Sequence, residues 1–294
     1  MNKKAQLSVV IASIGRPGLT KILQDITKSS AQFAPQIILV LDGVEANDPN
    51  VKLWKELSSK VLINPTQLGP SVSYSRGIAE VKTPYFRIFT DDDEWDALAF
   101  EESMIELEPS TVLVCQTNSH DEFGSAIRNS NFPPELSPLE SVYCPILPWK
   151  RNIVYFHLTS MIFPIEVAQV NFDETLPIRE DLDWLQKIYY AGIKFKFSKI
   201  VLSSVNPSHV RSFERQTLDI DLAWTLRLKL VSRALSKQFV YFHCYRSAAL
   251  VGKPSVIFKG ILRLYRIVGP PNIKEFAAIS FYLLIAVLKK LKSR

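Results

Sequence analysis

The chain has few cysteines, no glycine-rich phosphate loop and no apolar run long enough to cross a membrane comfortably. Its 294 residues include three cysteines, Cys115, Cys144 and Cys244, which do not cluster. An odd number of scattered cysteines shows neither a disulfide framework nor the paired spacing of a zinc site, so the sequence predicts a protein of the reducing cytoplasm. The apolar stretch near the N-terminus is interrupted by Gly15 and Pro17, too early for a secretory signal peptide.

Acidic residues are scarce in the C-terminal part of the chain. From Lys229 onward the sequence has 13 Lys and Arg residues and one acid, Glu275, which gives that part a net charge of +12. Residues 1–228 have 22 basic and 28 acidic residues, a net charge of −6, so the whole chain carries +6. This asymmetry predicts an anionic surface as a partner of the C-terminal part.

A short apolar segment lies inside this basic region. Residues 276–288 are apolar apart from Ser280, and a Lys- and Arg-rich end follows them. As a helix these residues span about 20 Å, whereas the core of a bilayer is about 30 Å thick. We therefore expect interfacial attachment to anionic lipid, peripherally on the inner membrane face. The alternatives are a helical hairpin that packs on the rest of the chain and a contact between copies of it.

The first two thirds of the sequence alternate between strand and helix patterns, which predicts an α/β fold. Near-continuous apolar runs at residues 7–13, 36–41, 60–63 and 85–90 are typical of strands buried on both faces of a parallel sheet. In a doubly wound sheet, ligands bind at the carboxyl ends of the strands. From about residue 217 the pattern is helical. We expect residues 1–215 to form one domain and residues 216–294 a helical extension.

Three consecutive aspartates, Asp91-Asp92-Asp93, follow the fourth apolar run. Adjacent carboxylates at a strand end repel one another, and a divalent cation relieves that repulsion because hard cations prefer oxygen ligands. An Asp-x-Asp pair with a bound metal can hold a diphosphate, so the sequence predicts an enzyme that uses a nucleotide-diphospho donor. The alternative is an acidic surface turn or a helix N-cap.

A second acidic group, Glu180-Asp181, opens a predicted helix over residues 180–191. A carboxylate in a partly dry cleft has a raised pKa and can accept a proton from an attacking hydroxyl. The alternative is structural, because acidic side chains favour the first turn of any helix.

The order of these motifs resembles that of family 2 glycosyltransferases, which have the GT-A fold. The motifs that carry the resemblance are, in order, Ser8–Ser13, Arg16-Pro17, Asp42, the segment 64–77, Asp91–Asp93 and Glu180-Asp181. The resemblance covers about residues 5–215 and implies a Rossmann-like mixed sheet flanked by helices. It also implies a hexosyltransferase that moves a sugar, with inversion, from a nucleotide-diphospho-sugar to a carbohydrate or lipid-linked acceptor in polysaccharide or glycolipid assembly.

The resemblance assigns catalytic and metal-binding roles to particular residues. It makes Asp181 the base and Asp93 the main ligand of Mg²⁺ or Mn²⁺. Asp91 lies nearer the ribose but can share the metal, and the register within the triplet is open. His209 is expected to face the metal or the diphosphate, with a solvated loop histidine as the alternative.

The resemblance also implies a set of donor-binding residues. Asp42 would contact the base or ribose of the nucleotide, or else cap its own turn. Ser13 and Arg16 would line the same pocket, although Arg16 can equally be a solvated loop residue. The family usually has Arg-Asn where this chain has Tyr74-Ser75, so Arg76 is expected to supply the missing charge one position later.

Two other functions compete with this interpretation. A sugar-nucleotide pyrophosphorylase has the same sheet type but carries a glycine-rich phosphate loop after the first strand, and residues 13–17 do not form one. A non-catalytic protein that binds membranes through its basic tail would not need Asp93 or Asp181. We expect no nucleic-acid partner, because the tail does not interleave aromatic and basic residues.

Overall fold

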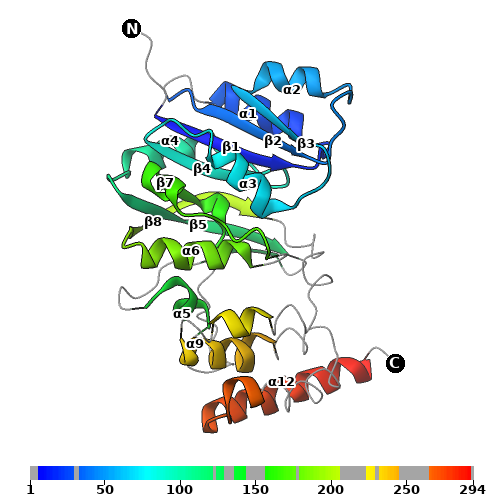
Figure 1. Ribbon diagram of the computed structural model, residues 1–294, viewed down its shortest axis with the longest axis vertical. Helices are drawn as coiled ribbons and strands as arrows, with labels where there is room; N and C mark the ends of the chain where they lie inside the picture. The colour runs from blue at the N-terminus through cyan, green and yellow to red at the C-terminus, as the bar shows by residue number, and fades with distance from the viewer. Residues whose placement is uncertain are drawn as a thin grey trace. The chain divides into compact units, whose positions relative to one another are not determined.

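The structure, a computed structural model, describes residues 6–29, 33–121, 124–128, 136–143, 156–176, 179–205, 223–228, 232–244 and 265–292 (Figure 1). The chain divides into two compact units. The first consists of residues 1–131 and 154–208, and the second of residues 132–153 and 209–294. The domain boundary expected at residue 215 falls within residues 206–222, which lie outside the described ranges, so that boundary stays a prediction.

The first unit is built on a sheet whose central strands are parallel. The parallel strands are β1 (Leu7–Ser13), β2 (Gln36–Asp42), β3 (Lys60–Asn64) and β4 (Tyr85–Thr90), in the spatial order β3-β2-β1-β4. Every residue of β1 except Ala12 is buried, as expected of a strand covered on both faces. The predicted α/β fold with a doubly wound core is confirmed.

The other half of the sheet is mixed. Beyond β4 the order continues with β7 (Met161–Pro164), β5 (Thr111–Asp121) and β6 (Gly124–Arg128), each antiparallel to its neighbour. The long strand β8 (Lys194–Val205) pairs in parallel with β5. In this half the carboxyl ends of the strands therefore lie at both edges of the sheet, whereas β1, β2 and β4 all have their carboxyl ends at the same edge.

Helices cover both faces of the parallel strands (Figure 1). They are α1 (Leu19–Ser29), α2 (Val51–Leu57), α3 (Pro70–Ile78) and α4 (Ala97–Ile105). Helix α6 (Glu180–Tyr190) lies beside the mixed half of the sheet, where Trp184 packs on Phe163 of β7. The 3₁₀ turns η1 (Leu158–Ser160) and η2 (Ile165–Gln169) flank β7. Side chains from α1, α2 and α4 pack with Val9 and Leu39 in one core. Because successive strand residues face opposite ways, Val10 and Val40 face the other side, where α3 lies.

Helix α3 lies unusually close to the sheet because of Gly77. A Cβ atom at this position would lie 2.4 Å from a methyl carbon of Val10 and 3.2 Å from one of Val40. No real Cβ contact is that short, so only glycine allows this approach. Helix α3 lies largely within the segment 64–77 that carries part of the resemblance, and its N-terminal end lies beside the carboxyl ends of β2 and β3.

The described part of the second unit is helical. The sequence predicts this from about residue 217 onward, but it does not predict the short helix at residues 138–143. Its elements are α5 (Pro138–Tyr143), α9 (Arg233–Gln238), the π-helical segment η3 (Phe239–Cys244) and α12 (Ile273–Lys292). Helix α12 begins with a capping box, in which Asn272 Oδ1 accepts from the Glu275 N–H and Glu275 Oε2 accepts from the Asn272 N–H.

Helix α12 has one buried and one exposed apolar side. Ala278, Ile279, Tyr282 and Ala286 are buried, whereas the exposed apolar residues are Ile273, Phe276, Leu284, Val287, Leu288 and Leu291. Among the described helices, including this one of 20 residues, none has the length and apolar character needed to span a bilayer.

Candidate functional site

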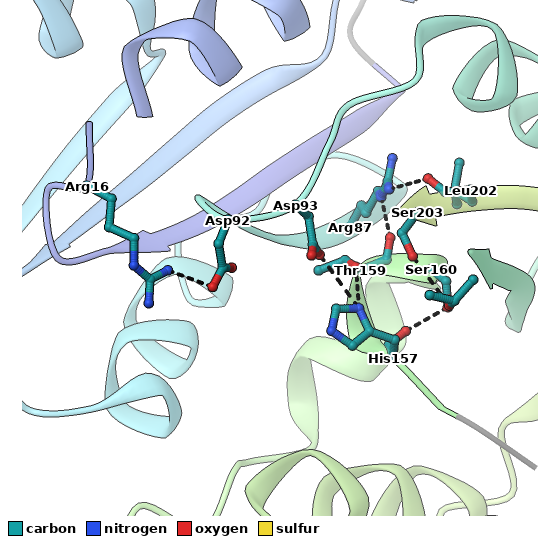
Figure 2. Close-up of polar contacts among 10 residues, drawn as sticks. Arg16, Arg87, Asp92, Asp93, His157, Thr159, Ser160, Leu202 and Ser203 are labelled. Carbon is teal, nitrogen blue, oxygen red and sulfur yellow. Dashed lines mark hydrogen bonds and ion pairs between the residues drawn. The ribbon is translucent and has the colours of Figure 1, made fainter. Parts of the chain in front are cut away.

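The carboxyl end of β4 carries the aspartate triplet next to the end of β1. Asp91 is buried and accepts hydrogen bonds from the Ser13 hydroxyl and the Arg16 guanidinium. Arg16 also lies 2.9 Å from a carboxylate oxygen of Asp92 (Figure 2). The structure therefore brings together three of the predicted donor-site residues, Ser13, Arg16 and Asp91, because parallel β1 and β4 end at the same edge.

Asp93 has a different environment from Asp91. Its side chain is only 5% exposed, and Nδ1 of His157 lies 3.6 Å from its Oδ2 atom. Burial raises the pKa of Asp93, while His157 and the hydroxyl groups of Thr159 and Thr90 lower it in part. Within the described ranges, neither Oδ2 of Asp93 nor the buried hydroxyl of Thr90 makes a hydrogen bond of ordinary geometry, although the hydroxyls of Thr90 and Thr159 lie close enough to lower the pKa of Asp93.

The buried oxygens of Asp93 and Thr90 suit a site that binds a cation, because neither has an ordinary hydrogen bond within the described part of the chain. A buried carboxylate oxygen that lacks a donor costs free energy, and a hard cation removes that cost by accepting the oxygen as a ligand. No set of three or more His, Cys, Asp or Glu side chains in the described part of the chain is arranged to hold a metal. A cation at Asp93 would therefore take most of its ligands from phosphate oxygens and water, as Mg²⁺ usually does.

The second acidic group lies at the start of α6. Arg179, just before it, has a left-handed backbone with φ +68°. Such a conformation is uncommon outside glycine, Asn and Asp, and it sets the direction in which the helix starts. Asp181 Oδ1 accepts a hydrogen bond of 2.7 Å from the N–H of Leu182. The predicted helix over residues 180–191 is observed as Glu180–Tyr190.

Burial raises the pKa of both carboxyl groups in this pair. For Glu180 the charge of Asp181 raises the pKa further, while Arg179 lowers it in part. For Asp181 the Leu182 N–H, then His157, then Arg179 act against burial. A carboxylate with a raised pKa is a stronger base than an exposed one, and this is the property that proton abstraction from a hydroxyl requires.

Tyr74 on α3 lies among these acidic groups. Burial raises the pKa of its hydroxyl, and the charges of Glu180 and then of Asp93 raise it further, so the phenol stays protonated. Its ring lies 5.9 Å from the ring of Phe172, which stacks on Trp184 at 4.3 Å. Trp184 is fully buried and is a core residue. At position 74 the resembled family usually has a charged arginine, whereas this chain has the neutral phenol of Tyr74, which can donate a hydrogen bond.

Asp42 and Arg76, two more predicted donor contacts, are bound within the chain. The Asp42 carboxylate accepts from Asn64 Nδ2 at 2.7 Å and from the backbone N–H groups of Leu68 and Gly69, each at 2.9 Å. Arg76 donates to the side-chain oxygen of the same Asn64. Both residues thus hold the loop that leads into α3, and their contact with a nucleotide stays a prediction.

His209, the histidine expected near the metal, lies outside the described residues. The structure instead places His157, for which the sequence offered no role, beside Asp93. Its neighbours in sequence show no motif, and its position depends on η1 lying next to β4. A sequence pattern could not reveal this contact, because 64 positions separate the two residues.

Two cavities in the described structure lie elsewhere. One of about 500 Å³ is lined by Ser75, Asn171, Phe172, Asp173, Glu174 and Lys187. Another of about 570 Å³ is lined by Glu94–Leu98, Asn118 and residues 201–204 of β8. Neither lining includes Asp93 or Asp181, so the carboxylates and not a cavity define the candidate site.

No protein-family model and no curated protein sequence matches the chain. Solved structures of S. aureus TarS do match it. The fragment of residues 1–349 of TarS has 12% identity and a TM-score of 0.59, and the match covers 98% of this chain and 92% of the fragment. The same fragment in complex with UDP-GlcNAc gives 13% identity and a TM-score of 0.62, with the same coverage.

A longer TarS structure matches with 13% identity and a TM-score of 0.61, over 97% of this chain and 53% of that one. Identities this low establish the fold and nothing more. The mixed sheet with its parallel β3-β2-β1-β4 core is that of the GT-A fold, so the fold expected from the motif order is confirmed.

Proposed function

We propose that this chain is a glycosyltransferase that moves a hexosyl unit from a nucleotide-diphospho-sugar to an acceptor hydroxyl. The observation that carries the proposal is the meeting of two buried acidic groups, Asp93 and the pair Glu180-Asp181. His157 lowers the pKa of both Asp93 and Asp181, and the charges of Glu180 and Asp93 both raise the pKa of Tyr74, so the two groups lie within electrostatic reach of the same two side chains. A transferase needs a cation site for the leaving diphosphate and a base for the acceptor, and Asp93 and Asp181 would supply them within one GT-A fold.

The proposed donor is a uridine diphosphate sugar. The support is the likeness of the whole chain to TarS, which was crystallised with UDP and with UDP-GlcNAc. Ser13, Arg16 and Asp91 would face the donor at the edge of β1 and β4. Arg16 is the exposed cation of this group, with 44% of its side chain accessible, and it would exchange a carboxylate for a phosphate oxygen.

The reaction is a single displacement. Asp181 takes the proton of the acceptor hydroxyl as the oxygen bonds to the anomeric carbon, and the bond from that carbon to the phosphate oxygen breaks. Attack from the side opposite the leaving group inverts the anomeric configuration. Mg²⁺ or Mn²⁺ supplies charge neutralisation of the departing nucleoside diphosphate. Asp93 would hold the cation, with Asp91 and His209 as the other candidate ligands.

The proposed acceptor is a carbohydrate or a lipid-linked sugar at an anionic membrane surface. The support is α12, whose exposed apolar residues lie beside the exposed Lys290. A helix of this kind lies in the membrane interface with its lysines on anionic lipid. We propose that the enzyme acts peripherally, on the cytoplasmic face, in polysaccharide or glycolipid assembly.

The test is binding of UDP, GDP, CDP and dTDP by isothermal calorimetry, each with and without Mn²⁺. We expect Mn²⁺ to strengthen the binding of UDP, Asp93→Asn to lose this effect of Mn²⁺, and the wild type to release UDP from UDP-GlcNAc. A folded wild-type protein that binds none of the four nucleotides would contradict the proposal. Binding to anionic vesicles alone would then favour the non-catalytic membrane protein.

A further inference from the structure

The 3₁₀ turn η1 lies against β4, and His157, which precedes it, forms a polar pair with Thr159 beside Asp93. Nδ1 of His157 shares a hydrogen bond of 2.5 Å with the hydroxyl of Thr159, and the same nitrogen lies 3.6 Å from Asp93 (Figure 2). Thr159 is 1% exposed. Ser160 closes the turn, because its hydroxyl and its N–H both donate to the carbonyl oxygen of His157, at 2.7 and 3.0 Å.

A buried arginine fixes this turn from inside the sheet. Arg87 on β4 is fully buried, and its Nε donates to the carbonyl oxygen of Thr159 at 2.8 Å. Its Nη2 donates to the carbonyl oxygen of Leu202 on β8 at 2.9 Å (Figure 2). The guanidinium lies 4.9 Å from the ring centres of both Phe89 and Trp95. Burying such a cation is costly, so its contacts hold β4, η1 and β8 in one arrangement.

We propose that His157 and Thr159 are positioning residues that hold the Asp93 carboxylate in the orientation required to bind a divalent cation, with Arg87 anchoring Thr159. This inference rests on the proposed function, since it assigns Asp93 to the cation. Metal-binding side chains are oriented by a surrounding layer of hydrogen-bonding groups, and loss of such a group costs about 10- to 100-fold in metal affinity. The arrangement from Arg87 to Thr159 to His157, whose Nδ1 lies 3.6 Å from Asp93, supplies such a layer.

The experiment is a titration of the full chain with Mn²⁺ in the presence of UDP, followed by electron paramagnetic resonance of free Mn²⁺. Thr159→Val removes the hydroxyl at nearly constant shape, Thr159→Ser keeps it, and His157→Phe removes the ring nitrogens. We expect Thr159→Val and His157→Phe to raise the Kd for Mn²⁺ about 10-fold or more. Thr159→Ser should bind Mn²⁺ as the wild type does, and UDP binding in EDTA should not change.

Wild-type Mn²⁺ affinity in both Thr159→Val and His157→Phe, with loss of binding in Asp93→Asn, would overturn this inference and leave the proposed function standing. An equal loss of UDP binding in EDTA would also overturn it, because a general distortion would then explain the result. If the wild type itself bound no Mn²⁺, this inference would be wrong. Release of UDP from UDP-GlcNAc in EDTA would then test separately whether the chain is a glycosyltransferase. Should circular dichroism show Thr159→Val to be unfolded, His157→Phe decides alone, since that side chain is 27% exposed.

Discussion

At the scale of single residues, the two acids that open α6 differ in what they can do. Asp181 is fixed by the N–H of Leu182, and His157 and Arg179 stabilise its charged form. Glu180 has a pKa raised by burial and by Asp181, so it is the member of the pair that more readily holds a proton. A base must be charged when the acceptor arrives, and this requirement favours Asp181.

We expect Asp181→Asn to lower kcat by about 100- to 10,000-fold, the usual contribution of a general base. The KM for the donor should change little, because the proton transfer belongs to the acceptor side. Steady-state kinetics of UDP release in the presence of an acceptor measures both constants. Glu180→Gln should cost clearly less. A larger loss in Glu180→Gln than in Asp181→Asn would reverse the assignment.

The same pair predicts how stability depends on pH. Burial raises the pKa of Glu180, so the folded protein holds its proton more tightly than the unfolded chain. The stability that comes from this group is fully present below the pKa of an exposed Glu, about 4.3, and is lost as the pH rises through the raised pKa. We therefore expect Glu180→Gln to raise the Tm relative to the wild type at pH 8 and to lose this advantage toward pH 4.

Thermal unfolding in EDTA across this pH range is the measurement. Glu174→Gln is the control, because Glu174 is exposed on the loop before α6. It should leave the pH dependence of Tm unchanged. A wild type whose Tm falls in parallel with that of Glu180→Gln would show that Glu180 does not contribute.

At the scale of elements, α3 depends on one glycine. Gly77→Ala would place a methyl group against Val10 and Val40, which are fixed in β1 and β2. Overpacking of this kind costs about 1–3 kcal/mol. We expect urea unfolding to show that loss. UDP binding should also weaken, because α3 connects Tyr74 to the loop whose Leu68 and Gly69 are bound by Asp42. Gly18→Ala, whose Cβ would meet nothing closer than 3.5 Å, is the control and should change stability little.

Arg87 on β4 donates hydrogen bonds to both the turn η1 and strand β8. Arg87→Met keeps most of the volume but leaves the buried carbonyl oxygens of Thr159 and Leu202 without their donors. Each such group costs about 1–3 kcal/mol. We expect a loss of about 2–4 kcal/mol in urea unfolding. Stability equal to that of the wild type would show that the carbonyl groups find other donors.

At the scale of the whole molecule, charge and apolar surface are distributed unequally along the chain. The first unit contains the acidic site, and the basic C-terminal region contains α12 with its exposed apolar residues. Exposed apolar residues beside a lysine are unfavourable in water. They become favourable if this side of α12 lies at the boundary between lipid headgroups and acyl chains.

We expect the chain to sediment with vesicles that contain anionic phospholipid and to remain in solution with neutral phosphatidylcholine vesicles. Leu284→Glu with Leu288→Glu should abolish sedimentation, because two charges would enter the apolar boundary. Raised salt should weaken the binding, since screening acts on the lysines. Binding of the double variant at wild-type strength would indicate that α12 does not touch the membrane.

Much of the fold and part of the site followed from the sequence. The apolar runs placed β1 to β4 within a residue or two, because a strand buried on both faces has few compositions open to it. Asp91–Asp93 was recognised because three carboxylates follow an apolar strand, and Glu180-Asp181 because of its place in the motif order. The sequence could not place His157 or Thr159 in the site, since nothing in their local context distinguishes them from core residues. It noted Tyr74 only as a departure from the pattern of the resembled family.

By itself, then, the sequence determined the α/β class, the parallel core, the acidic strand tip and the basic C-terminal region, because these depend on local composition and periodicity. Only the tertiary structure decided which side chains meet. It bound Asp42 and Arg76 to Asn64, paired Arg16 with Asp91 and Asp92, and set η1 against β4. Contacts of this kind join residues 12 to 115 positions apart, and they form only when the whole sheet has assembled.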